Sequence, residues 1–284
     1  MECLNGLVVK NECGTYVIEY EGVFYRCKPR GTFKKDKLNV LVGDKVTFDD
    51  EDFIITSINE RKNYLIRPPI ANIDQALVVF SLVEPSFSYL LVFKYITYLN
   101  SHSISPIIVL TKSDRFIDED KLSEIMDVFK KLKIPFFVVS SLTGEGIDSL
   151  KEIFKNKTTC FMGQTGVGKS SLLNVLDPTF VRKVGSYSVA LHRGKHETKE
   201  VILLPFNDGY VSDTPGFSSL DLKLTKKELA SYFPLFMDLS LKCYYSNCLH
   251  LNEKQCEVKK MLEENNYPRI AYDCYLKLLM DIKE

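Results

Sequence analysis

The stretch GQTGVGKS, residues 163–170, constrains this chain more than any other feature. It matches the pattern Gly-x-x-x-x-Gly-Lys-Ser, follows the apolar run CFM and precedes the helical run SLLNVL. A glycine-rich turn between a strand and a helix predicts a loop whose main-chain amides surround a phosphate. A glycine turn before an amphipathic helix is the alternative, but it leaves the agreement of strand, motif and helix unexplained.

Each part of this loop has an expected role. The glycines permit main-chain angles that side chains would forbid. Lys169 is expected to reach the β and γ phosphates and to act in catalysis, and Ser170 is expected to ligate Mg²⁺. The nucleotide-binding residues predicted here are Gly163, Gln164, Thr165, Gly166, Val167, Gly168, Lys169, Ser170 and Ser171.

The later stretch GYVSDTPGF, residues 209–217, predicts the γ-phosphate side of the same site. Asp213 is expected to hold Mg²⁺ through water, and the amide of Gly216 is expected to bond the γ-phosphate. A plain Asp-Thr-Pro-Gly turn is the alternative.

The stretch VLTKSD, residues 109–114, is typical of a loop that selects guanine. Guanine offers two adjacent donors, so a carboxylate that accepts both rejects adenine, and Asp114 is the candidate carboxylate. Lys112 is expected to lie along the base plane, and the Thr111 hydroxyl is expected to hold neighbouring loops. In VVSSLTGEG, main-chain amides after the next strand are expected to bind the base oxygen. A simple turn after a strand is the alternative. The residues predicted to surround the base are Thr111, Lys112, Ser113, Asp114, Ser140, Ser141 and Leu142.

The order of these motifs is unusual, because the base-side loops precede the phosphate loop by about fifty residues. Ligands of a parallel sheet bind at the carboxyl ends of its strands, whatever the order in which the chain visits them. A circular permutation of a GTPase therefore explains a complete set of loops in this order.

The patterning around these motifs predicts several domains. Apolar runs such as QALVVFSL, PIIVLT, PFFVVS and TTCFMG alternate with helical stretches, including residues 118–132 with Asp118 as N-cap, and predict a mostly parallel sheet with helices on both sides. Short strand-like runs between residues 4 and 61 predict a small barrel, first an OB-fold and second an SH3-like barrel. Two further helices are expected at residues 253–264 and 267–283, with Pro268 in the first turn of the second.

Four metal-binding side chains follow in the spacing Cys-x4-Cys-x-His-x5-Cys. Three thiolates and one imidazole complete a tetrahedral Zn²⁺ shell with no open position, so the predicted site is structural. Chance clustering of reduced cysteines is the alternative. The predicted ligands are Cys243, Cys248, His250 and Cys256.

Charge and composition limit the nucleic-acid surfaces and the cellular locations that this chain can have. The chain has 284 residues and equal numbers of basic and acidic side chains, 37 each, so any nucleic-acid surface must be local. It has no apolar run long enough for a membrane span and no secretion-like start, so we expect a cytoplasmic protein without a membrane partner. We also expect it to be a monomer.

One such local surface is the stretch YRCKPRGTFKK, residues 25–35. Its cations can meet phosphates, and Tyr25 and Phe33 are expected to be exposed and to stack on unpaired bases. The acidic stretch DDED, residues 49–52, offsets this charge, and a solvated loop is the alternative. The cations are Arg26, Lys28, Arg30, Lys34 and Lys35.

With these motifs in place, the chain resembles the ribosome small-subunit-dependent GTPases of the RsgA/YjeQ family. The resemblance rests on RPPIANIDQALVVFS, TKSD, SSLTGEGID, GQTGVGKSSLLN, RGKHETK and DTPGF, and it covers nearly the whole chain. It implies a multidomain α/β protein: an RNA-binding OB-fold barrel at residues 1–66, a circularly permuted P-loop GTPase domain at 67–221, and a helical zinc-binding domain at 222–284. It further implies that these parts engage the small ribosomal subunit and its rRNA late in assembly.

The chain departs from the GTPase pattern at the residues expected to activate water. Phe217 stands where many GTPases have a glutamine, so His196 in RGKHETK is the candidate catalytic group. The family pattern has threonine where this chain has Glu197. Thr198 remains as the residue expected to sense the γ-phosphate through Mg²⁺.

These observations predict a GTPase that hydrolyses GTP to GDP and phosphate with Mg²⁺ and carries one structural Zn²⁺, and the resemblance adds stimulation by the small ribosomal subunit. One alternative is a nucleotide-gated RNA-binding scaffold with little hydrolysis. A second is a P-loop ATPase or small-molecule kinase.

Overall fold

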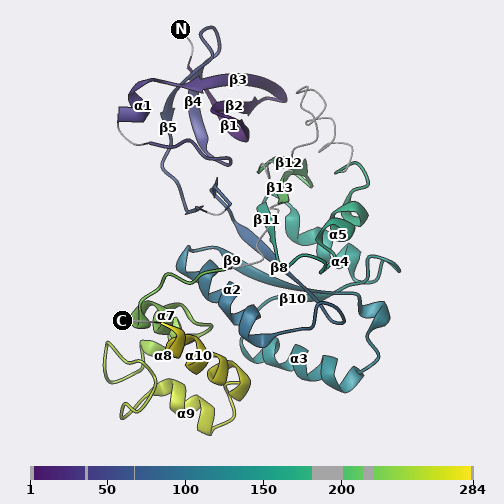
Figure 1. The fold of residues 1–284 in the computed structure, drawn as a ribbon, viewed down its shortest axis with the longest axis vertical. Coiled ribbons are helices and arrows are strands. Elements are labelled where there is room, and N and C mark those ends of the chain that lie inside the picture. The colour runs from purple at the N-terminus through teal and green to yellow at the C-terminus, as the bar shows by residue number, and fades with distance from the viewer. Residues whose placement is uncertain (1–2, 36–37, 67, 181–200, 214–219, 283–284) are drawn as a thin grey trace. The chain divides into compact units, whose positions relative to one another are not determined.

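A computed structural model describes residues 3–35, 38–66, 68–180, 201–213 and 220–282 (Figure 1). The chain forms two compact units. The first contains residues 1–75, 148–162 and 170–216, and the second contains residues 76–147, 163–169 and 217–284.

A closed barrel of five strands opens the first unit. The strands are β1 (Cys3–Glu12), β2 (Thr15–Tyr20), β3 (Val23–Pro29), β4 (Lys45–Asp49) and β5 (Ile54–Ile58), in the order β1-β2-β3-β5-β4, and α1 (Thr32–Lys35) follows β3. Every second side chain points inward, so that Val8, Ile18, Cys27 and Phe48 fill the core without exposure. This is the OB-type barrel that the sequence predicts.

The barrel corrects one expectation about its RNA-binding side chains. Phe33 is only 6% exposed and belongs to the barrel core, and the ring of Tyr25 lies 5.0 Å from that of Phe48, so the prediction that Phe33 is exposed for stacking is wrong. The exposed aromatic side chain of β3 is instead Phe24, which alternation places on the same outward face as Arg26 and Lys28. The side chains of Lys34 and Lys35 lie outside the described part of the structure.

A hydrogen-bonded linker joins the barrel to the rest of the first unit. It contains the antiparallel pair β6 (Tyr64–Leu65) and β7 (Ile70–Ala71). Asn63 exchanges two side-chain hydrogen bonds with the main chain of Ile73, and the Asn72 amide donates to the carbonyl of Gly43 in the barrel at 2.8 Å. Asp74 accepts from Lys62 Nζ at 2.9 Å and from the amide of Thr158 at 2.8 Å.

The remaining elements of the first unit follow the linker and include three strands. They are η2 (Glu152–Phe154), β11 (Thr158–Met162), α5 (Lys169–Leu176), β12 (Leu203–Phe206) and β13 (Gly209–Asp213). β11 and β13 are parallel, whereas β12 and β13 form an antiparallel hairpin whose turn residues, Asn207 and Asp208, both have positive φ. α4 (Ile147–Lys151) precedes η2 and begins in the second unit, and Lys169, the first residue of α5, also belongs to the second unit.

The second unit contains three neighbouring strands and their helices. β8 (Gln75–Ser81), β9 (Ser105–Thr111) and β10 (Phe136–Val138) neighbour one another in the order β10-β9-β8, and β10 is parallel to β9. All seven residues of β8 are buried, as its unbroken apolar run predicts. α2 (Tyr89–Ser101), η1 (Ser113–Arg115) and α3 (Glu119–Lys131) connect the strands. Asp118 caps α3 as predicted, accepting from the amide of Lys121.

The C-terminal part of the second unit is helical. It comprises α7 (Lys226–Tyr232), α8 (Phe236–Ser240), α9 (Glu257–Glu263) and α10 (Arg269–Asp281). The predicted helix start at residue 253 is wrong, because the Glu253 carboxylate accepts from the amides of Leu249 and Leu251 and so closes a loop before α9. α10 begins directly after Pro268, which lies at its N-cap position.

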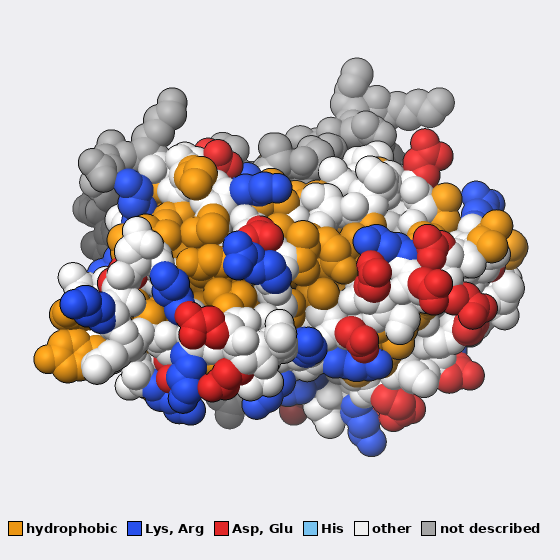
Figure 2. Space-filling model, turned by 90° about the horizontal axis from the view of Figure 1, so that it is seen from below, with side chains coloured by type: hydrophobic (Ala, Val, Ile, Leu, Met, Phe, Trp, Pro, Cys, Tyr) orange, Lys and Arg blue, Asp and Glu red, His pale blue; other side chains and the backbone are white. Residues whose placement is uncertain are grey.

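Figure 2 shows one face of the molecule, on which hydrophobic side chains gather near the middle and charged side chains of both signs intermix around them. This face therefore offers no field of a single sign. None of the helices in the described part of the chain is long and apolar enough to cross a membrane.

Candidate nucleotide site and metal centre

The phosphate loop of residues 163–169 has the conformation that its glycines predict. Gly163, Gly166 and Gly168 all have positive φ, at 142°, 84° and 99°. A Cβ atom at Gly163 would lie 2.4 Å from the carbonyl oxygen of Val79, so the close approach of the loop to β8 requires glycine. Val167 is 1% exposed and anchors the loop in the core.

Lys169 lies at the start of α5 and points back across the loop. Its Nζ donates to the carbonyl oxygens of Gly163 and Gln164, both at 2.7 Å. The ammonium group is thereby held beside the loop whose amides are expected to bind phosphate, where it can add positive charge to the helix N-terminus. Ser170 and Ser171 follow as the second and third residues of α5.

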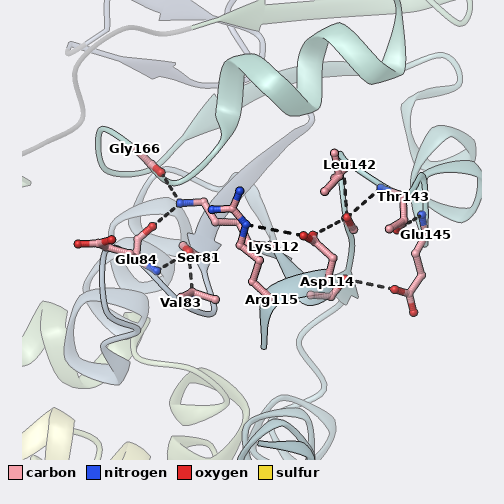
Figure 3. A network of polar contacts seen from close by, with 12 residues as sticks. Ser81, Val83, Glu84, Lys112, Asp114, Arg115, Leu142, Thr143, Glu145 and Gly166 are labelled. Carbon is pink, nitrogen blue, oxygen red and sulfur yellow. Dashed lines mark hydrogen bonds and ion pairs between the residues drawn. The ribbon is translucent and has the colours of Figure 1, made fainter. Parts of the chain in front are cut away.

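Two residues of the stretch TKSD connect three loops of the second unit, and Figure 3 shows the contacts of one of them, Lys112, with Glu84 and Gly166. The buried Thr111 hydroxyl lies 2.5 Å from the carbonyl oxygen of Val167 and 3.2 Å from that of Phe80. Lys112, in the left-handed conformation, donates from Nζ to the carbonyls of Gly166 and Glu84. The base-side and phosphate loops therefore meet, although about fifty residues separate them in the chain.

Asp114 is held in place by the second base-side loop. The Ser140 hydroxyl donates to Asp114 Oδ1 at 2.5 Å and accepts from the amides of Leu142 and Thr143 at 3.2 and 3.1 Å. Arg115 Nε lies 3.8 Å from the other carboxylate oxygen (Figure 3). An ionised carboxylate has about four lone-pair positions, so this geometry leaves it able to accept from a guanine base.

Sequence reasoning missed two side chains of this network, those of Ser81 and Glu145. The Ser81 hydroxyl accepts from the amides of Val83 and Glu84 and shapes the loop whose carbonyl binds Lys112. Glu145 accepts from the Ser113 hydroxyl at 3.3 Å. Ser81 directly follows the apolar run of β8, and a polar residue at a strand end was the available signal.

The γ-phosphate side is described only in part. Asp213 is the last residue of β13, in the first unit. The predicted residues His196, Thr198 and Gly216, together with Phe217, lie outside the described residues.

The four predicted metal ligands come together in the C-terminal helices. Their ligand atoms all lie within 4.8 Å of one another, and Cys248, His250 and Cys256 are buried. His250 Nδ1 lies 3.4 Å from Cys256 Sγ and 3.8 Å from Cys243 Sγ, which makes Nδ1 the ligating nitrogen. Its Nε2 lies 3.2 Å from the Ser240 hydroxyl, to which it donates when Nδ1 binds a metal.

Four side chains that the sequence did not reveal brace the ligand loop. Glu253 accepts from the amides on both sides of His250, those of Leu249 and Leu251, at 2.7 Å each. Burial opposes its ionisation, but these amide hydrogen bonds hold the pKa of Glu253 below its ordinary value. The hydroxyls of Tyr272 and Tyr275 donate to the carbonyls of His250 and Leu249. Ser240, which faces His250 Nε2, is the fourth.

The chemistry of this set fits one structural Zn²⁺. Burial lowers the pKa of His250 to about 4, so its imidazole is neutral at pH 7, as a ligand must be. Burial raises the pKa of Cys248 to about 12 and also raises that of Cys256. A divalent cation that binds this cluster displaces the protons of the thiols and is held by the resulting thiolates. Four protein ligands complete a tetrahedral shell, so the centre is structural.

Two family models match this chain. The RsgA GTPase family matches residues 58–223, and the RsgA N-terminal domain matches residues 5–53. The chain belongs to the RsgA GTPase family. It is therefore a GTPase, which decides against an ATPase or a small-molecule kinase.

The chain also aligns with individual relatives over nearly the full length of both proteins. A Geobacillus protein named small ribosomal subunit biogenesis GTPase RsgA is 39% identical over 285 residues, covering 98% of this chain and 97% of that protein. A protein of the same name from Caldanaerobacter subterraneus subsp. tengcongensis is 37% identical over 289 residues, covering 100% and 97%.

Two solved structures show the same fold. YjeQ from Thermotoga maritima matches with a TM-score of 0.85 and 32% identity, covering 99% of this chain and 98% of that one. YloQ, described as a circularly permuted GTPase, matches with a TM-score of 0.81 and 36% identity, covering 99% and 95%. The chain thus has the permuted GTPase fold that its motif order predicts.

Proposed function

We propose that this GTPase is stimulated by the small ribosomal subunit and acts late in the maturation of that subunit, as a cytoplasmic monomer. The observation that carries the proposal is a pair of base-side loops: Thr111 and Lys112 are hydrogen-bonded to the phosphate loop, and Ser140 is hydrogen-bonded to Asp114. The relatives of this chain are named for small-subunit biogenesis. The three functional regions are residues 1–66, 67–221 and 222–284.

In this proposal guanine is read by Asp114. Its carboxylate accepts the two adjacent donors of the base, while Ser140 fixes the orientation of the carboxyl group. Lys112 supports the base plane through its aliphatic stem, since its Nζ is held by two carbonyls. Ser113, Ser141 and Leu142 complete the loops around the base.

The phosphates and Mg²⁺ occupy the other end of the site. The amides of residues 163–171 and the ammonium of Lys169 bind the phosphates, and Ser170, Thr198 and Asp213 hold Mg²⁺. Gly216 bonds the γ-phosphate. His196 positions or activates the attacking water in place of the glutamine that Phe217 replaces.

The RNA partner is proposed to meet the outward face of β3. Phe24 is 47% exposed there, and Arg26 and Lys28 share its side of the strand. An exposed aromatic ring beside two cations suits an unpaired base and its phosphates. We call these three side chains the β3 face.

Rates of GTP hydrolysis with small subunits, with large subunits and without ribosomes test this function. We expect stimulation by small subunits alone. Hydrolysis that is equally slow in all three cases would instead favour a nucleotide-gated RNA-binding scaffold. A His196→Ala protein with the stimulated rate of the wild type would remove His196 from the mechanism.

A further inference from the structure

Within the first unit, the barrel contacts the β12–β13 hairpin at two places. Lys10 of β1 forms an antiparallel bridge with Ile202, the residue before β12. The Tyr210 hydroxyl of β13 donates to Glu19 Oε2 of β2 at 3.0 Å, across 191 residues of sequence. Both strands of the hairpin are therefore connected to the barrel.

Burial on the outside of the barrel agrees with this contact. Tyr16 and Ile18 point into the barrel core, so alternation places Val17 and Glu19 on the outward face of β2. Val17 is nevertheless only 6% exposed, and its partner across the β1–β2 ladder, Lys10, is 2% exposed. An outward face this buried, with a strand bridge at Lys10, is a packed interface.

The hairpin occupies a special place in the GTPase fold. β12 follows the segment that contains His196 and Thr198, and β13 ends at Asp213, shortly before Gly216. β13 also pairs in parallel with β11, which leads directly into the phosphate loop. The hairpin thus connects the two segments proposed to sense the γ-phosphate.

The other end of the contact reaches the β3 face. Glu19 Oε1 accepts from the amide of Gly22 in the β2–β3 turn at 2.7 Å, so both of its carboxylate oxygens are bonded. Glu19 is also the register partner of Phe24. Residues directly opposite in an antiparallel pair share a face and lie about 5 Å apart at Cβ. One carboxylate therefore connects β13, the β2–β3 turn and the β3 face.

We propose that Tyr210 and Glu19 are positioning residues that couple the nucleotide state to the barrel. A shift of β13 on exchange of GDP for GTP moves the Tyr210 hydroxyl, and Glu19 transmits this to the β2–β3 turn and to Phe24. The inference rests on the proposed function in one respect, namely that the β3 face binds RNA. The coupling itself is a property of the isolated protein.

Hydrogen exchange of the full-length, zinc-loaded protein tests the coupling without ribosomes. The amide of Gly22 is expected to exchange at different rates with GDP and with a non-hydrolysable GTP analogue bound. In Tyr210→Phe this difference disappears, whereas in the control Glu21→Gln, which changes another side chain of the β2–β3 turn, it persists. Equal Gly22 exchange in both nucleotide states of the wild type would overturn the coupling, whatever the ribosome does.

Hydrolysis assays then separate coupling from folding. Tyr210→Phe and Glu19→Gln should retain subunit-free hydrolysis and GDP affinity within about twofold, while stimulation by small subunits falls roughly tenfold, the size expected for one hydrogen bond to a charged group. The double variant should lose no more than Tyr210→Phe alone. If both single variants are stimulated as strongly as the wild type, the coupling is wrong. If small subunits do not stimulate the wild type, the proposed function is wrong, and the hydrogen-exchange result alone then tests the coupling.

Discussion

The nucleotide loops and the cysteine cluster both gather polar groups around a place for a charged ligand, but they hold those groups differently. In the nucleotide loops, Thr111, Lys112 and Lys169 are bonded to main-chain carbonyls, so protein atoms alone fix the geometry. In the cysteine cluster, the ligand atoms face one another, and burial raises the pKa of two of the thiols. The first site is built before its ligand binds, whereas the second depends on its ligand.

Removal of a metal ligand should therefore have the largest effect. Cys256→Ala is expected to abolish stoichiometric zinc binding and the cooperative unfolding of the C-terminal helices, since structural zinc contributes about 10 kcal/mol or more to such domains. Metal analysis and hydrogen exchange of residues 220–282 measure both. Cys274→Ala, which removes a buried thiol of α10 outside the cluster, should keep one zinc. One bound zinc in Cys256→Ala would contradict the ligand assignment.

Asp114→Asn should have the next largest effect, and on affinity rather than folding. The amide can no longer accept both guanine donors, so GTP affinity is expected to fall roughly 100-fold while ATP affinity stays unchanged. Competition of GTP and ATP against labelled GDP measures the preference. Glu145→Gln, which alters a carboxylate of the same loops, should retain it. A preserved preference for GTP in Asp114→Asn would place guanine recognition elsewhere.

A smaller effect is expected beside the metal ligands. Ser240→Ala leaves all four ligands but removes the partner of His250 Nε2, and loss of such a partner typically lowers metal affinity roughly tenfold. Competition with a zinc chelator measures this. Ser246→Ala, on the exposed part of the ligand loop, is the control. Equal affinities of the Ser240 variant and the wild type would show that the thiolates alone orient the imidazole.

The smallest effect is expected at Thr111, where several bonds share the task. Thr111→Val keeps the shape but leaves the buried Val167 carbonyl without this partner, so GDP affinity should fall roughly fivefold to tenfold. Thr111→Ser, which keeps the hydroxyl, should bind as the wild type does. Full affinity of the valine variant would mean that Lys112 and the glycine backbone fix the loops alone.

Much of the fold could be predicted because apolar runs and motifs carry strong local signals. The runs QALVVFSL and PIIVLT became β8 and β9, and Asp118 caps α3 as expected. β12 was missed because the short run LLPF contains a proline and resembles a loop. Phe33 was misplaced because its neighbours in sequence are basic, whereas the short helix α1 turns it into the barrel core.

The metal ligands were easier to predict from sequence than the side chains that hold the functional residues in place. Motif spacing identified the zinc ligands, whose convergence the structure shows. It could not reveal that the Ser140 hydroxyl bonds Asp114, or that Glu253 braces His250, because these depend on loop geometry rather than on residue order. Glu253 was assigned to a helix for the same reason.

The linker between barrel and sheet has a practical consequence for dividing this protein. A shortened chain beginning at residue 67 would lose Asn63, whose side chain satisfies the main chain of Ile73, and β6, which pairs with β7. It would also expose Ala71, against which Gly43 of the barrel packs closely. A Cβ atom added at Gly43 would lie 2.1 Å from the carbonyl oxygen of Ala71. A separately produced GTPase domain should therefore keep its residues from about 60 onward. Even then, the main-chain groups of β7 that face the barrel would have to form hydrogen bonds with water.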